Sequence, residues 1–160
     1  MHEMLGNHHF LLRDYVQALA HYEVVLSKGM ASTFLRKRAI VCYIQTRQVD
    51  QALPLFANLI AEDIGCIIGH DNEQEGCPCP EIIQEYESRM TGSPSQNDLT
   101  AMGMLWLYCE SKQSLQWFDR AVQQEPHNPY LKSVVTILSS TNINDASPHN
   151  VNKEEQHNEE

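Results

Sequence analysis

Residues 15–26, YVQALAHYEVVL, carry apolar side chains that recur every three or four residues. This spacing is typical of one face of an α-helix. Residues 51–60, QALPLFANLI, repeat the pattern. A shift of 34 residues carries similar side chains onto one another: Ala18 onto Ala52, Tyr22 onto Phe56 and Val25 onto Leu59. We therefore expect helices that recur with this period.

Short polar turns separate the predicted helices and suggest how they begin and end. Asp14 and Asp50 are expected to cap the helices that follow them, because a carboxylate accepts hydrogen bonds from the first free backbone N–H groups. Gly29 is expected to end the first pair as a left-handed residue. The elements are thus predicted to be antiparallel helix pairs.

The pattern resembles the tetratricopeptide repeat (TPR), a family of helix pairs that recur every 34 residues. Three copies carry the resemblance: Leu5, Gly6, Tyr15, Ala18 and Tyr22 in the first, Tyr43, Ala52 and Phe56 in the second, and Gly103, Trp106, Trp117, Phe118, Ala121 and Pro126 in the third. Three positions depart from it. Ser114 takes the place of the alanine in the third copy. Ile40 replaces a small residue, which predicts a looser helix crossing. Gly103 comes one residue late relative to Phe118, which indicates a one-residue deletion near Glu110.

The resemblance implies an all-α fold, a TPR-like α-solenoid in which stacked pairs share a core. The predicted organisation is a helical domain over residues 1–140, with repeats at about 1–31, 32–65 and 96–128 and a C-terminal capping helix over 129–139. Pro129 suits the first position of that helix, and Asn128 suits its cap.

Two stretches fall outside the repeats. Residues 66–95 form an irregular, cysteine-containing segment, which is either a degenerate repeat or an insertion with a function of its own. Residues 141–160 hold five carboxylates, one lysine and no aromatic residue. Such a composition predicts a disordered acidic tail, because it cannot bury enough apolar surface to offset its ordering entropy.

Charge and hydropathy exclude several classes of partner. The chain of 160 residues has 11 basic and 21 acidic side chains and a net charge of −10. This charge argues against non-specific nucleic-acid binding and against binding to anionic membranes. No apolar run approaches the ~20 residues that cross a bilayer, and no signal peptide is visible after Met1. We therefore expect a cytoplasmic protein with neither nucleic acid nor membrane as partner.

The sharpest chemical signal is a group of four side chains that zinc accepts as ligands, namely Cys66, His70, Cys77 and Cys79. Alternatively, Cys77 and Cys79 are reduced loop thiols, or a redox-active or disulfide-bonded pair. Five cysteines in total do not suggest a secreted disulfide framework. The chain contains no glycine-rich phosphate loop and no Gly-x-Ser-x-Gly motif, so we expect no enzyme activity and no obligatory cofactor.

The resemblance also implies a concave groove, lined by the first helix of each pair, that accepts a peptide or helix of another protein. The residues expected to line this partner groove are Asn7, Phe10, Phe34, Lys37, Val41, Ile44, Leu99 and Trp106. A clamp for chaperone C-terminal carboxylates is not expected, because Glu3 and Arg38 stand where lysine and asparagine would be needed. The predicted function is therefore an interaction module or adaptor. The alternatives are a secretion-type chaperone that holds a partner segment, and a small zinc-binding or redox-sensing protein that uses residues 66–79.

Overall fold

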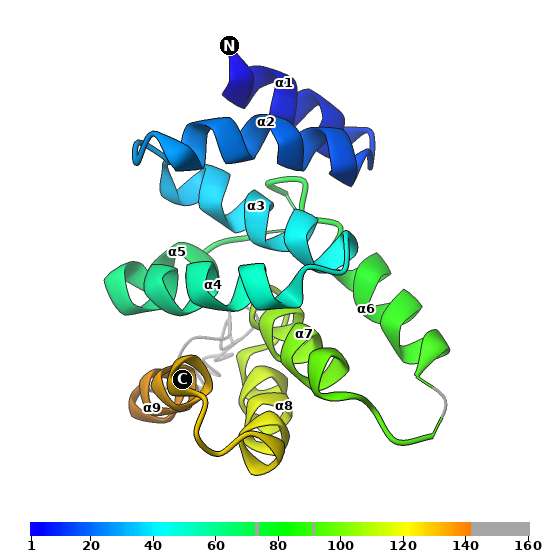
Figure 1. Cartoon of the computed structure of the whole chain (residues 1–160), viewed down its shortest axis with the longest axis vertical. Coiled ribbons are helices and arrows are strands. Elements are labelled where there is room, and N and C mark those ends of the chain that lie inside the picture. Colours follow the sequence, from blue (N-terminus) through cyan, green and yellow to red (C-terminus); the bar gives the residue numbers. More distant parts are fainter. Residues whose placement is uncertain (73, 91, 142–160) are drawn as a thin grey trace, which may run out of the picture.

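A computed structural model of the chain describes residues 1–72, 74–90 and 92–141 (Figure 1). All regular structure in these ranges is helical, which confirms the all-α prediction. The predicted tail lies outside the described residues from 142 onward. The helices in chain order are α1 (His2–Leu11), α2 (Tyr15–Ser27), α3 (Thr33–Gln45), α4 (Val49–Asp63), α5 (Gly65–Ile68), α6 (Cys79–Arg89), α7 (Gln96–Leu107), α8 (Ser111–Gln124) and α9 (Pro129–Ser140).

Three helix pairs are stacked in chain order. α1 packs on α2, α3 on α4, and α7 on α8, with a short turn inside each pair (Figure 1). Between pairs, α2 packs on α3 and α4 packs on α7, while α9 closes the end against α4 and α8. No helix in the described ranges is long and apolar enough to cross a membrane.

Glycine allows the helices of two pairs to cross closely. A Cβ atom on Gly6 would lie 2.6 Å from Cε1 of Tyr22, and one on Gly103 would lie 2.8 Å from Cδ2 of Phe118. Ile40 takes the equivalent place in α3, and α3 and α4 make fewer close backbone contacts than the other two pairs. This agrees with the looser crossing expected there.

The turns inside the pairs follow the 34-residue period. Arg13 and Arg47 both have left-handed backbone, with φ of 63° and 61°. The third turn, Tyr108 to Glu110, has no residue with positive φ. Gly103 is accordingly one residue closer in sequence to Phe118 than Gly6 is to Tyr22. This is the difference that the predicted deletion near Glu110 requires.

The helix ends agree with three of the four predicted caps. Asp14 accepts a hydrogen bond from the backbone N–H of Gln17, and Asn128 caps α9. Gly29 has a φ of 70° just after α2. The prediction for Asp50 was wrong: α4 already begins at Val49, so Asp50 lies in its first turn. A carboxylate there still favours the helix, because it faces the positive end of the dipole.

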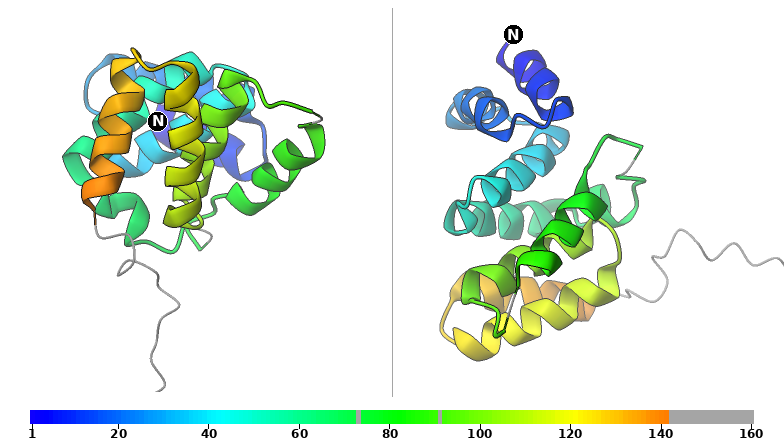
Figure 2. Two further views of the ribbon diagram at one scale, coloured as in Figure 1. Left: turned by 90° about the horizontal axis from the view of Figure 1, so that it is seen from below. Right: turned by 90° about the vertical axis from the view of Figure 1, so that its right-hand side faces the viewer.

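Residues 66–95 interrupt the regular succession of helix pairs. α4 packs on α7, which brings the third pair against the second. The four-residue α5 is too short to act as a repeat helix, and α6 packs against α7. Tyr86 of α6 also donates a hydrogen bond to the backbone oxygen of Ile44, at the end of α3. The right-hand panel of Figure 2 shows α6 lying along one face of the stack.

Candidate functional site

The face shared by α1 and α3 is covered by residues 74–78, which we call the covering loop. Its closest approach is at Gly76, where a Cβ atom would lie 3.1 Å from Cδ2 of Leu11 and 3.4 Å from Nη2 of Arg38. Gly76 also has a φ of 85°, a conformation that favours glycine. The backbone of the loop therefore rests directly on both helices.

An ion pair fixes the loop to α3. The carboxylate of Glu75 lies 2.9 Å from Nζ of Lys37 and 2.7 Å from Nδ1 of His70. The Lys37 side chain is only 7% exposed, so its ammonium group is shielded from water. Burial favours a higher pKa for Glu75, but its hydrogen bonds with Lys37 and His70 outweigh this effect and hold the pKa below its ordinary value of 4.5.

Arg38 binds the loop through its backbone. Its guanidinium lies between two aromatic rings, 4.7 Å from the centroid of Phe10 and 4.3 Å from that of Phe34. From this position Nη2 donates a 2.7 Å hydrogen bond to the backbone oxygen of Glu75, and Nη1 donates to Oδ1 of Asn7. Cation–π contacts of this kind hold the arginine in place for the loop.

The far side of the site is closed by α7 and by the chain just before the loop. Tyr108 donates a hydrogen bond from its hydroxyl to the backbone oxygen of Lys37, and burial raises the pKa of Tyr108 well above 10.0. Asn72 donates to the backbone oxygens of Ile67 and Tyr108. Its Oδ1 is buried and finds no hydrogen-bond partner in the described part of the chain.

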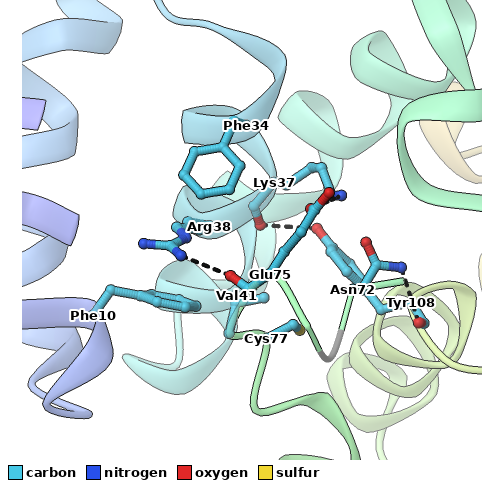
Figure 3. A pocket seen from close by; sticks show the side chains of 9 residues that line it. All are labelled: Phe10, Phe34, Lys37, Arg38, Val41, Asn72, Glu75, Cys77 and Tyr108. Carbon is cyan, nitrogen blue, oxygen red and sulfur yellow. Dashed lines mark hydrogen bonds and ion pairs between the residues drawn. The ribbon is translucent and has the colours of Figure 1, made fainter. Parts of the chain in front are cut away.

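A small cavity remains between these parts (Figure 3). Its volume is about 10 Å³, which is room for roughly one water molecule and too small for an organic ligand. Its wall is formed by Phe10, Phe34, Lys37, Arg38, Val41, Asn72, Glu75, Cys77 and Tyr108. The site can therefore act only as a contact surface while the loop is in place.

The structure brings together most of the predicted groove residues of the first two pairs. Four of them line the cavity, namely Phe10, Phe34, Lys37 and Val41, while Asn7 contacts it through Arg38. They form no open groove in this conformation, because the covering loop and neighbouring helices bury most of them. The remaining three lie apart from the cavity: Ile44 and Leu99 are fully buried, and Trp106 is half-buried with its indole nitrogen unpartnered in the described residues. Their role toward a partner stays a prediction.

The zinc candidates do not form a metal site. Cys77 and Cys79 are joined in a disulfide, and His70 contacts Glu75. Burial raises the pKa of the Cys66 thiol, which disfavours the thiolate that zinc requires. The described residues contain no group of three or more His, Cys, Asp or Glu side chains able to hold a metal ion. The disulfide alternative is thus the arrangement present.

Sequence reasoning missed four residues of the site. The sequence pattern indicated Arg38 only as a reason against a carboxylate clamp. It gave no indication of a role for Glu75, Asn72 or Tyr108. The turn-forming stretch around Gly76 and Pro78 marks a non-helical segment, yet nothing in it indicates which face it covers.

Comparison of the chain with protein-family models, curated proteins and solved structures finds no significant match. The function of the site is therefore inferred from its own geometry.

Proposed function

We propose that the protein is a TPR-like interaction module whose α1–α3 face binds an extended acidic segment of a partner protein. Two features support the TPR-like assignment. The left-handed turn residues Arg13 and Arg47 are 34 positions apart, and the glycine–aromatic crossing of Gly6 recurs at Gly103. A stack of such pairs presents its first helices on one side, where a peptide can lie across them.

The observation that carries the proposal is the way this face holds the covering loop. Lys37 binds a carboxylate, Arg38 binds a backbone carbonyl, and Gly76 permits close approach of the peptide backbone. These are the contacts by which a groove recognises an extended peptide, with the backbone supplying affinity and the side chain supplying specificity. The covering loop thus acts as an internal ligand with the sequence Glu-Gly.

An internal ligand competes strongly with any external one. A short flexible connection gives an effective concentration of about a millimolar, so a partner segment must bind more tightly than the loop or find the loop displaced. The segment preferred by this face carries a carboxylate followed by a small residue, because a larger side chain would clash with Leu11 and Arg38.

Peptide binding to a variant with a released loop tests the proposal. Glu75→Ala with Gly76→Val removes the carboxylate and places a side chain against Leu11, so the loop should leave the face. We expect a labelled peptide of residues 74–80 to bind this variant and not the parent, as measured by fluorescence anisotropy.

Two controls make the test specific. Adding Arg38→Ala to the released variant should weaken binding by roughly tenfold or more, the scale of one lost charge-assisted hydrogen bond. A peptide with glutamine in place of Glu75 should bind less tightly than the acidic one. If the released variant keeps its helical circular dichroism and binds no peptide, the proposed function is wrong.

A redox-sensing role is the second candidate, and the Cys77–Cys79 disulfide favours it. Cys77 is half-buried at the end of the covering loop, so a dithiol reductant can reach it. Exchange would break the sulfur–sulfur bond, leave one thiol on Cys77 in the loop and one on Cys79 at the start of α6, and oxidise the reductant to its own disulfide. If reduction alone enables the 74–80 peptide to bind the parent protein, the disulfide controls access to the face.

A further inference from the structure

A second, larger cavity lies between the α3–α4 turn, the C-terminal half of α6 and the start of α7. Its volume is about 420 Å³, within the range of roughly 300–1,000 Å³ that small-molecule sites occupy. Its wall includes Arg47 of the turn, Tyr86 and Arg89 of α6, and Asn97 and Asp98 of α7. No residue lines both this cavity and the one beneath the covering loop, so it is a separate site.

Both arginines of this cavity lack an acidic partner in the part of the chain that the structure describes. The guanidinium carbon of Arg89 lies 4.9 Å from the centroid of the Tyr86 ring, and Nε donates a 3.4 Å hydrogen bond to the backbone oxygen of Glu85. The Arg47 side chain makes no hydrogen bond with any described residue. Most of the guanidinium N–H groups are therefore available to a ligand.

The first helix pair shows how an arginine at this place in the repeat is neutralised. Arg13 lies 34 residues before Arg47 and has the same left-handed backbone, with φ of 63° against 61°. Its Nη2 atom lies 3.7 Å from Oε1 of Glu81, in the first turn of α6. At the other end of α6, the charged side chain that lines the cavity with Arg47 is Arg89. α6 thus supplies an anion to the first turn and a second cation to the second.

Tyr86 lies between the two arginines of the cavity. Its hydroxyl donates a 3.3 Å hydrogen bond to the backbone oxygen of Ile44. Burial raises the pKa of Tyr86, and the charges of Arg89 and Arg47 act against this rise. Both guanidinium groups are therefore near the same hydroxyl, and an anion between them would relieve their mutual repulsion.

Of the described residues that line the cavity, only Asp98 carries a carboxylate, and it is engaged in capping α7. Its Oδ2 atom accepts a hydrogen bond from the backbone N–H of Ser95, whose Oγ accepts one from the backbone N–H of Asp98. Two arginines against one aspartate leave an excess of positive charge in the wall. This excess occurs in a chain whose net charge is −10, so the cavity is a local exception that favours an anion.

We propose that this cavity binds a phosphate monoester of a small polar molecule, with the phosphate between Arg47 and Arg89. A phosphate monoester carries a charge of about −1.5 to −2 at neutral pH, which two guanidinium groups match. Its oxygens also accept paired hydrogen bonds from arginine, whereas a carboxylate would neutralise only one of the two.

The remaining room in the cavity favours an organic phosphate over the free ion. A volume of about 420 Å³ is several times that of a small inorganic anion. The side-chain amide of Asn97 lines this space and has no hydrogen-bond partner among the described residues, so it can bind a hydroxyl of the ligand. The proposal is independent of the peptide-binding role of the α1–α3 face.

Titration of the isotope-labelled full chain with a sugar phosphate, followed by amide chemical shifts, tests the proposal. We expect glucose 6-phosphate to cause saturable shifts at Arg47, Arg89 and Asn97. Inorganic phosphate should cause shifts at the two arginines with affinity lower by roughly tenfold, because it makes no contact with Asn97. Unphosphorylated glucose should cause none. Equal affinity for the two phosphates would overturn the proposal in favour of a site for the free ion.

Three arginine variants locate the site. Arg47→Gln and Arg89→Gln, made separately, should each weaken binding of glucose 6-phosphate by roughly tenfold or more, the scale of a lost charge-assisted hydrogen bond. Arg13→Gln is the matched control, because it removes the same charge from the equivalent turn outside the cavity. It should leave the affinity unchanged.

All three arginines are exposed, so helical circular dichroism should stay at the parent value in each variant. Absence of saturable shifts with either phosphate at millimolar concentration would overturn the proposal. An equal loss of affinity in Arg13→Gln would also overturn it, because binding would then follow the overall charge and not the cavity.

Discussion

The ion pair between Lys37 and Glu75 should contribute measurably to the free energy of unfolding. The neighbouring ion pair, which Arg36 of the same helix makes with Glu62, should not. Glu75→Gln removes the negative charge but keeps the shape of the side chain, and it leaves the buried Lys37 ammonium unpaired. Removing one partner of a fully buried pair costs about 3–5 kcal/mol. Glu75 keeps 31% of its side-chain exposure, so water can partly replace it. We therefore expect a loss of about 2 kcal/mol.

The neighbouring pair of Arg36 and Glu62 is a matched control. Its atoms lie 2.7 Å apart, closer than those of the Lys37 pair, but Glu62 is 60% exposed. Exposed pairs contribute little, so Glu62→Gln should cost about 0.3 kcal/mol. Burial, and not distance, is thus predicted to decide the difference between the two pairs.

Urea unfolding followed by circular dichroism measures both effects. The double variant Lys37→Met with Glu75→Gln removes both charges. Its loss of unfolding free energy should be smaller, by about 1 kcal/mol or more, than the sum of the losses in the two single variants. If the single losses add to within about 0.5 kcal/mol, the two side chains are not coupled. The pair would then have no part in holding the covering loop.

Four further outcomes are expected. The difference in unfolding free energy between the parent and Glu75→Gln should shrink as the pH falls below 4.5. The reason is that a carboxyl with a lowered pKa stabilises the fold only while it is ionised. A difference that grows under acid would contradict this prediction. Gly103→Ala should cost about 1–2 kcal/mol in urea unfolding, since crowding against Phe118 outweighs a gain of about 1 kcal/mol in helix propensity; an unchanged midpoint would disprove the close crossing. Ala18→Leu and Ala52→Leu should each cost about 1–3 kcal/mol by overpacking, and a variant that melts like the parent would refute the repeat register. Reducing the Cys77–Cys79 disulfide should accelerate proteolysis in the covering loop, whereas a Cys77→Ser, Cys79→Ser variant should be cleaved at one rate with or without reductant.

The helix pairs could be predicted because their signals are local and periodic. The recurrence of Ala18 at Ala52 indicated where two of the helices lie, and the shift between Gly103 and Phe118 indicated the shortened turn. Asp50 shows the limit of such reasoning. Asp50 is of a residue type that often caps helices, but α4 already begins at Val49, and the residue at its cap position is Gln48.

The covering loop could not be predicted because its contacts are distant in sequence and follow no period. Lys37 and Glu75 are 38 positions apart, and the pair forms only because α4 and α5 return the chain to α3. The sequence therefore predicted a concave groove that is open to a partner segment. In the structure it is closed, and its strongest contacts are made by Lys37 and Arg38.

The proposed function requires that the covering loop lies on the face formed by α1 and α3. Nuclear Overhauser contacts between the α-protons of Gly76 and the methyl groups of Leu11 test it directly in the full chain. We predict strong contacts, because a Cβ atom on Gly76 would lie 3.1 Å from a Leu11 methyl carbon. If both residues are assigned and no such contact is seen, the loop does not lie on this face and the proposed function is wrong.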